Sequence, residues 1–292
     1  MNTRSESAHV SLGAYGRVPH EIAIADALAC PPTDPLLGTL STHRMQLCPQ
    51  NLGYLDRDWA VALRERHPEI EWRLHANVRV RDVGRVIDLC DWPTQRDYFQ
   101  TLGGISEALG APVYSAHAGR RSVASIDAVI RHSLAMTQYL GMPVAIEGHY
   151  PVPGNVWLFS SWREYRLLLE SRAWFALDLS HLHILATRSG VTEHALVAEM
   201  LACERCLEVH VSANDGQRDQ HLPLTEPPWW WPLLDHLHDQ AVIFSEGRIA
   251  SGTQRTTANH TPHPPQHGGF PHPSPALWVA PRIASGGMTR TT

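Results

Sequence analysis

Short apolar runs alternate with longer amphipathic stretches along most of this chain. The runs predict eight β-strands, at residues 9–13, 45–48, 73–76, 112–116, 144–146, 174–179, 207–211 and 241–245. Between them, apolar residues recur at helical spacing and predict helices at residues 21–29, 56–66, 93–109, 122–140, 161–171, 192–201 and 230–238. Strands that alternate with helices in this order and over this length predict an α/β fold, a (β/α)8 TIM barrel.

A doubly wound open sheet is the alternative α/β architecture. Dinucleotide-binding sheets of that kind carry a glycine-rich phosphate turn directly after the first strand. The residues that follow position 13 do not form such a turn. The sequence therefore favours the barrel.

The alternating pattern stops after residue 250. Residues 251–292 are rich in proline, glycine, threonine and serine, and their scattered histidines show no periodicity. A segment of this composition cannot bury enough apolar surface to offset the entropy lost on ordering. We predict a barrel domain at residues 1–250 and a disordered tail at residues 251–292.

Arginine supplies every basic residue, because the sequence contains no lysine. This excludes a lysine Schiff base and a lysine general base. The 29 acidic residues exceed the 24 basic ones and give a formal net charge of −5, which counts against the basic surface of a nucleic-acid-binding protein. We therefore expect a small-molecule or peptide substrate and no nucleic-acid partner.

The five cysteines are an odd number spread over a long chain, a pattern typical of a reduced, cytoplasmic protein. Cys203 and Cys206 have redox-motif spacing, but no thioredoxin-like segment precedes them, and we interpret them as ordinary thiols. The first residues lack the apolar core of a signal peptide, and no apolar run approaches the roughly 18 residues of a membrane span. The sequence leaves the oligomeric state open, and a homo-oligomer is compatible with it.

Histidine and carboxylate residues stand at the ends of six successive predicted strands and in the loops that follow. The carboxyl ends of the strands form the active-site face of a TIM barrel. The candidate metal ligands on this face are His75, His117, Glu147, Asp178, His181, His210, Asp219, His221 and Glu246.

The stretch at residues 207–224 shows how the pattern works locally. A buried strand ends near His210, the chain turns at Asn214-Asp215-Gly216, and the loop then returns Asp219 and His221 to the same edge. Imidazole and carboxylate ligands suit Mn, Fe, Co and Zn. Four carboxylates without a cation would repel one another, so we predict one to three divalent metal ions. The alternative is a metal-free network of ion pairs and hydrogen bonds.

The motifs around these residues resemble those of a known superfamily. They are Leu74-His75, Ser115-Ala-His117-Ala-Gly119, Ala145-Ile-Glu147-Gly, Leu177-Asp178-Leu-Ser-His181, Val209-His210-Val, Asp219-Gln-His221 and Ser245-Glu246-Gly. Across residues 9–248 the chain resembles the xylose-isomerase-like TIM-barrel superfamily. That superfamily includes sugar isomerases and epimerases, endonuclease IV-type enzymes and multinuclear non-haem iron oxidases.

The resemblance implies a metal-dependent enzyme, and its leading branch is a sugar isomerase or epimerase. In that branch residues matching Glu147, Asp178, His210 and Glu246 hold the metal, and the two glutamates exchange a proton with a sugar-like substrate. The nine-ligand set matches the multinuclear iron oxidases, which modify peptides, often with a partner protein. The short spacing between His210 and Asp219 departs from that branch. A phosphodiesterase of the endonuclease IV type ranks third, and a metal-binding partner protein without catalysis is the non-enzymatic alternative.

Weaker signals concern the substrate. Trp229 and Trp230 stand near the predicted site face and are candidates for a lid that stacks on the substrate, although large aromatic residues also commonly fill gaps between helices. Arg248, two residues after Glu246, is a candidate for holding a phosphate or carboxylate of the substrate. Arg120 and Arg121 are weaker candidates for the same role.

Overall fold

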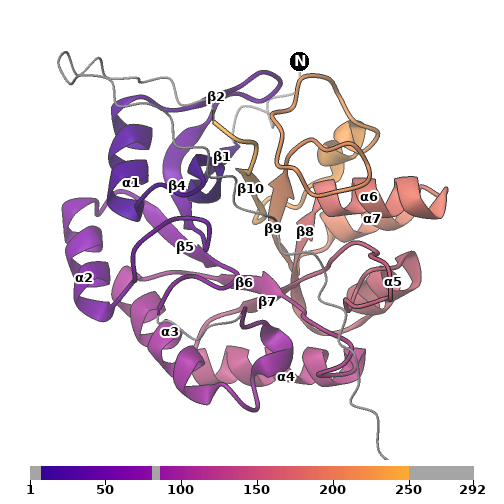
Figure 1. The fold of residues 1–292 in the computed structure, drawn as a ribbon, viewed down its shortest axis with the longest axis horizontal. Coiled ribbons are helices and arrows are strands. Elements are labelled where there is room, and N and C mark those ends of the chain that lie inside the picture. The colour runs from indigo at the N-terminus through magenta and orange to yellow at the C-terminus, as the bar shows by residue number, and fades with distance from the viewer. Residues whose placement is uncertain (1–7, 81–85, 250–292) are drawn as a thin grey trace, which may run out of the picture. The chain divides into compact units, whose positions relative to one another are not determined.

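Eight parallel strands close into a barrel in the computed structural model, which describes residues 8–80 and 86–249 (Figure 1). The strands are β1 (His9–Ser11), β4 (Ser41–Leu47), β5 (Glu71–His75), β6 (Tyr114–His117), β7 (Val144–Glu147), β8 (Trp174–Asp178), β9 (Cys206–Val211) and β10 (Val242–Ser245). Each strand pairs with its neighbour in the chain, and β1 closes the barrel by pairing with β10. The predicted TIM barrel and its eight strands are confirmed.

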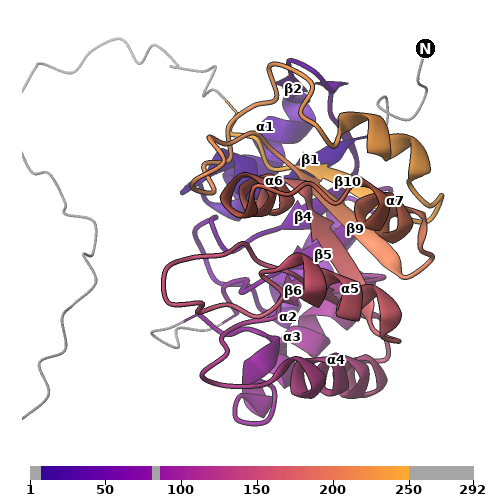
Figure 2. The same cartoon turned by 90° about the vertical axis from the view of Figure 1, so that its right-hand side faces the viewer.

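Helices surround the barrel on its outside, as Figures 1 and 2 show. They are α1 (His20–Ala29), α2 (Arg57–Arg66), α3 (Arg96–Leu109), α4 (Ile126–Leu140), α5 (Trp162–Glu170), α6 (Leu179–Ser189) and α7 (His194–Ala202). Short 3-10 helices add η2 (Leu12–Tyr15), η3 (Leu89–Asp91) and η4 (Trp231–His236). The apolar faces of the helices pack on the outer faces of the strands and form the main hydrophobic core.

Five elements were not predicted from the sequence pattern, namely strands β2 and β3, helix α6 and the 3-10 helices η2 and η3. The hairpin of β2 (Thr33–Asp34) and β3 (Gly38–Thr39) is too short to produce a hydrophobic period. Helix α6 was missed because β8 passes into it without a connecting loop. The Asp178 carboxylate accepts hydrogen bonds from the backbone N–H groups of Ser180 and His181, and this cap starts the helix at the end of the strand.

The sequence also led to predictions about the tail, about membrane spans and about the cysteines. The predicted tail at residues 251–292 and the boundary at residue 250 lie outside the described residues. Within the described residues, no helix has the length and apolar character needed to cross a membrane. All five cysteines are free, and Cys206 is buried, with a thiol pKa raised by burial.

The barrel interior contains polar as well as apolar side chains. Glu208 of β9 contacts Gln46 of β4 and Arg73 of β5, strands that are not neighbours of β9 in the sheet. Contacts between such distant strands are made only across the inside of the barrel. Side chains alternate between the two faces of a strand, so His210, two residues after Glu208, also faces the interior.

The titration of His9, at the start of β1, should make the protein less stable in acid. Burial, together with the charges of Arg44 and Arg73, lowers the pKa of His9 from 6.5 to about 4. The unfolded chain therefore binds more protons than the folded protein between these values, so stability falls as the pH falls. Between pH 7.5 and pH 5 this loss is on the order of 2 kcal/mol.

The change is measured by urea unfolding of the wild type and of His9→Gln at several pH values. The variant should lose less stability than the wild type over this interval. The matched control is His43→Gln, which removes an exposed histidine of β4 and should leave the pH dependence unchanged. Equal pH dependence in the wild type and His9→Gln would show that His9 does not contribute.

Candidate metal centre

The nine predicted ligands converge at the carboxyl-terminal end of the barrel. The register places the strand ends side by side, with His117 opposite Glu147 and Asp178 opposite His210. Most of the cluster is buried: Glu147, Asp178, His181, His210, His75 and Glu246 are between 0% and 6% exposed. The structure thus brings together residues that lie far apart in the sequence.

Glu147, at the end of β7, lies at the centre of the cluster. Its Oε2 atom is 3.4 Å from His75 Nε2 and 3.2 Å from His210 Nδ1. Its Oε1 atom is 3.5 Å from His117 Nε2 and 3.6 Å from His181 Nδ1. One carboxylate therefore faces imidazoles from four different elements.

The remaining ligands extend the cluster away from Glu147. His181 Nε2 lies 3.2 Å from Asp178 Oδ2 and 3.5 Å from Asp219 Oδ2. His221 joins Asp219 to Glu246, with distances of 3.1 Å from Nε2 to Asp219 Oδ2 and 3.5 Å from Nδ1 to Glu246 Oε2. The nine side chains form a continuous array.

Local hydrogen bonds hold the loop that returns Asp219 and His221. The backbones of Ala213 and Leu222 exchange two hydrogen bonds, of 2.7 and 2.8 Å, and these close the loop at its base. The Asn214 side-chain amide donates to the Ser180 carbonyl at 2.9 Å and ties the loop to α6. The turn expected at Asn214-Asp215-Gly216 is present, with Gly216 at a φ of +73°.

The pKa values show how strongly the charges interact. Burial alone would raise the pKa of Glu147, but the surrounding His75, His117 and His210 lower it well below its usual range. Burial lowers and the nearby carboxylates raise the pKa of His210 and His181, and both values end well above normal. The carboxylates therefore need positive charge beside them, which protonated imidazoles or a divalent cation supplies.

Several buried polar atoms of the cluster have no hydrogen-bond partner within the described residues. They are Glu147 Oε2, His210 Nδ1, Asp219 Oδ1 and His221 Nδ1. Buried polar atoms are normally paired, so this concentration of unpaired nitrogen and oxygen atoms is typical of metal ligands. Two triads, His75–Glu147–His210 and Glu147–Asp178–His181, each have ligand atoms within 4.8 Å of one another. The residues fit a divalent metal with nitrogen and oxygen ligands.

The orientation of His181 leaves one of its ring nitrogens pointing toward the carboxylates, where it could bind a metal. His181 Nδ1 lies 3.0 Å from the Gly148 carbonyl oxygen, so Nδ1 carries the proton and donates it. The Nε2 atom of His181, which faces Asp178 and Asp219, is then the atom that would bind a metal after losing its proton. Such outer hydrogen bonds fix the tautomer and orientation of metal-binding histidines.

A buried polar layer lies beneath the cluster, and the sequence analysis did not predict it. Ser115 Oγ donates to Glu208 Oε2 at 2.5 Å and lies 3.0 Å from His75 Nδ1. Glu208 Oε2 is also 3.4 Å from His210 Nε2, and Arg73 Nη1 is 3.2 Å from Glu208 Oε1. Glu208 therefore supports two ligand histidines from behind, and Arg73 balances its charge.

Strand periodicity was the signal that could have revealed this layer. Arg73, Ser115 and Glu208 each stand two residues before a ligand histidine on the same strand. Residues two apart share a face of a strand, so these side chains also face the interior. A glutamate within the apolar strand Cys206–Val211 requires a buried partner.

His149 is a second residue that the sequence analysis missed. Its ring stacks between those of His117 and Trp157, with centroid distances of 4.5 Å to each. These residues line a cavity of about 530 Å³, which we call the tryptophan cavity: Val86, Asp88, His117, Arg120, His149 and Trp157. His117 thus belongs both to the metal centre and to the aromatic wall of this cavity, which His149 and Trp157 form.

Two arginines considered as substrate contacts lie near this wall. The Arg120 guanidinium stands over the Trp157 ring, 4.9 Å from its centroid. Arg121 pairs with Glu164 of α5 and is therefore already neutralised. Arg120 is the one that borders the tryptophan cavity.

Trp229 and Trp230 pack within the protein. Trp230 is 0% exposed and belongs to the hydrophobic core. The ring of Trp229 packs edge-on against His194 of α7, with 5.2 Å between the ring centroids. Neither tryptophan lines either of the two cavities described here. This packing agrees with the alternative reading of both residues as structural side chains between helices.

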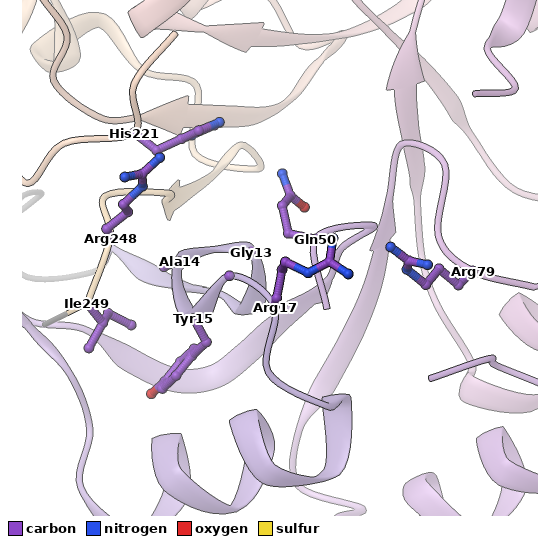
Figure 3. Close-up of a pocket in the computed structure, with 10 residues that line it drawn as sticks. Gly13, Ala14, Tyr15, Arg17, Gln50, Arg79, His221, Arg248 and Ile249 are labelled. Carbon is purple, nitrogen blue, oxygen red and sulfur yellow. The ribbon is translucent and has the colours of Figure 1, made fainter. Parts of the chain in front are cut away.

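A second cavity, of about 500 Å³, borders the metal centre at His221 (Figure 3). We call it the arginine cavity, and it is lined by Gly13, Ala14, Tyr15, Gly16, Arg17, Gln50, Arg79, His221, Arg248 and Ile249. Arg248, predicted as a substrate contact, is among these residues, and its backbone N–H donates to the His221 carbonyl at 2.8 Å. The metal centre therefore lies between two cavities.

Known structures share this architecture. No family model matches the sequence, and neither does any curated protein. A D-tagatose 3-epimerase-like protein superposes with a TM-score of 0.57 at 14% identity, covering 82% of this chain and 90% of that one. A xylose isomerase domain protein from Alicyclobacillus acidocaldarius gives 0.55 at 14% identity, covering 86% and 92%.

An AP endonuclease of family 2 from Brucella melitensis gives a TM-score of 0.54 at 12% identity, covering 84% of this chain and 93% of that one. At these identities the comparisons establish the fold. The sequence motifs predicted a barrel of this superfamily, and the structural matches are of that type. The chain therefore has a TIM-barrel fold like those of a D-tagatose 3-epimerase-like protein, a xylose isomerase domain protein and an AP endonuclease.

Proposed function

We propose that this protein is a metal-dependent isomerase or epimerase that moves a proton on a sugar-like substrate. The observation that carries the proposal is the placement of two glutamates around one buried histidine. His210 Nδ1 lies 3.2 Å from Glu147 Oε2 and 3.9 Å from Glu246 Oε1. Two carboxyl groups thus border the position at which the histidines and Asp178 would hold a divalent cation.

Two carboxyl groups in this arrangement can transfer a proton at carbon. One carboxylate accepts the proton from a substrate carbon, and the electron pair of the broken C–H bond moves toward the adjacent carbonyl group. The other carboxyl group returns a proton to the same or the neighbouring carbon. A bound divalent cation would supply Lewis-acid stabilisation of the negative charge on the substrate oxygen. Glu147 and Glu246 are the catalytic residues of this proposal.

The ligand set supports the role of the metal. His75, His210, Asp178 and His181 would contribute imidazole nitrogen and anionic oxygen donors, which suit Mn, Fe, Co and Zn, and the metal would displace the extra protons of the imidazoles. Glu208 and Ser115 would hold His75 and His210 in place from behind. Two of the structurally similar proteins have epimerase or isomerase names, which agrees with proton transfer on a sugar.

Elemental analysis of protein purified without oxygen tests the proposal. We expect one Mn, Co or Zn ion per chain in the wild type and less metal in His210→Ala, because the variant lacks a ligand at the centre of the cluster. The metal-loaded protein should exchange a substrate hydrogen with deuterated solvent in the absence of oxygen. An absence of metal binding under every supplementation would contradict the proposal.

A multinuclear iron oxidase that modifies a peptide is the second candidate. The observation that favours it is the size of the cluster, since nine donors exceed what one ion requires, and Glu147 belongs to both ligand triads. A carboxylate shared in this way can bridge two metals. Two or three irons per chain and iron-dependent oxygen consumption would establish this candidate. Tight metal binding without either activity would instead indicate a metal-binding partner protein.

A further inference from the structure

The arginine cavity places three guanidinium groups at one side of the metal centre. Arg17 follows β1, Arg79 follows β5 and Arg248 follows β10, while Gln50 follows β4. These four strands are consecutive around the barrel, in the order β5-β4-β1-β10. In Figure 3 the side chains of Arg17 and Arg79 point toward one another, and Arg248 lies beside His221. The cavity is therefore a local concentration of positive charge.

Acidic side chains do not neutralise this charge. Within residues 8–80 and 86–249, no ion pair joins Arg17, Arg79 or Arg248 to a carboxylate, although Arg66, Arg73 and Arg121 elsewhere in the barrel are paired with glutamates. Within the described residues, the Arg79 side chain makes one hydrogen bond, from Nε to the Pro49 carbonyl at 3.2 Å. Arg17 and Arg248 are exposed and Arg79 is half-buried, so these guanidinium groups are accessible to an anion that enters the cavity.

The walls of the cavity are held in place by contacts of their own. The Asn51 side-chain amide donates to the Leu12 carbonyl at 2.9 Å and fixes the turn that leads to Arg17. A Cβ atom at Gly13 would lie 3.1 Å from Gln50 Oε1, so glycine permits the close approach of Gln50. Gly16, at a φ of +63°, reverses the chain directly before Arg17.

We propose that the arginine cavity binds an anionic group of the substrate, a phosphate or a carboxylate, while the reacting carbon lies at the metal centre. Guanidinium groups match both anions through paired, charge-assisted hydrogen bonds. The volume of about 500 Å³ suits a small ligand, and the shared residue His221 joins the cavity to the catalytic cluster. This inference rests on the proposed function, and it narrows the substrate class to an anionic sugar derivative.

Calorimetric titration of the full-length protein with inorganic phosphate tests the inference. The protein is first treated with a chelator, so that phosphate cannot bind to a metal. We expect wild-type protein to bind phosphate, and Arg17→Gln and Arg248→Gln each to weaken binding by at least about tenfold, because a charge-assisted contact is lost. Arg163→Gln is the matched control, since it removes an exposed arginine of α5, and it should bind as the wild type does.

A parallel titration with succinate distinguishes the two sources of negative charge. Tighter binding of phosphate would indicate a phosphorylated substrate, and tighter binding of succinate a carboxylic acid. An absence of binding for both anions, or equal affinity in Arg17→Gln, Arg248→Gln and Arg163→Gln, would overturn the inference. The titrations use neither metal nor turnover, so their result is independent of whether proton transfer is found.

Discussion

Glu147→Gln should reduce the rate of substrate–solvent hydrogen exchange by at least about 100-fold, the lower end of what a positioned acid or base contributes. Glutamine has nearly the same shape as glutamate but neither accepts a proton from carbon nor carries the charge that attracts a cation. Glu147 also contacts four of the five histidines of the cluster. Because one side chain serves both roles, we expect the largest functional loss at this position.

The measurement is deuterium incorporation into a sugar or sugar derivative that the wild-type protein turns over, together with the metal content of each preparation. Glu170→Gln, at the exposed end of α5, changes the same chemical group far from the cluster and should retain wild-type exchange. Thermal unfolding of both variants shows whether they fold. A folded Glu147→Gln protein with undiminished exchange would exclude Glu147 as the catalytic group.

The fold was predictable because its signals are local and repeated. Each strand of the barrel is a short apolar run, and each predicted helix has an apolar face, so that errors at single boundaries did not change the architecture. Helix α6 escaped because the apolar residues of β8 continue into it, and the only boundary signal is Asp178. The same aspartate had been interpreted as a metal ligand, which concealed its role as a helix cap.

The candidate ligands were predictable for a topological reason. Every strand of a parallel barrel ends at the same face, so a histidine or carboxylate at a strand end must lie near the others. The supporting residues were harder to find. Arg17, Arg79 and Gln50 lie in loops whose course depends on tertiary contacts, such as the one between Asn51 and Leu12. No local pattern in the sequence links those loops.

Glu208 shows why a polar residue in a barrel strand can be as informative as one at its end. Its carboxylate is fully buried and contacts Arg73, Gln46 and Ser115 inside the barrel. Burial raises the pKa of a carboxyl group, but hydrogen bonds and the charge of Arg73 lower that of Glu208 to about 2, so it is ionised at neutral pH. A buried charge is tolerated only while its partners remain.

Glu208→Ala should therefore lower the free energy of unfolding by about 3–5 kcal/mol, the usual cost of removing one partner of a buried ion pair. The variant removes the buried one of the two carboxylates that pair with Arg73, leaving only Glu71 Oε1, 2.7 Å from Nε, and it deprives Ser115 of its acceptor. Urea unfolding at pH 7.5 measures the loss. In contrast, Glu199→Ala breaks the exposed pair with Arg166 and should cost less than about 1 kcal/mol.

The double variant Arg73→Leu/Glu208→Leu separates the charge from the packing. If the large loss in Glu208→Ala arises from a buried arginine that has lost its buried partner, removing both charges should recover much of the stability, because apolar replacements of buried ion pairs are often neutral. The double variant should nevertheless bind metal more weakly than the wild type, by roughly 10–100-fold, because His210 loses its contact with Glu208 and the Ser115 hydroxyl beside His75 loses its acceptor. Equal losses in Glu208→Ala and Glu199→Ala would instead show that the buried pair contributes no more than a surface one.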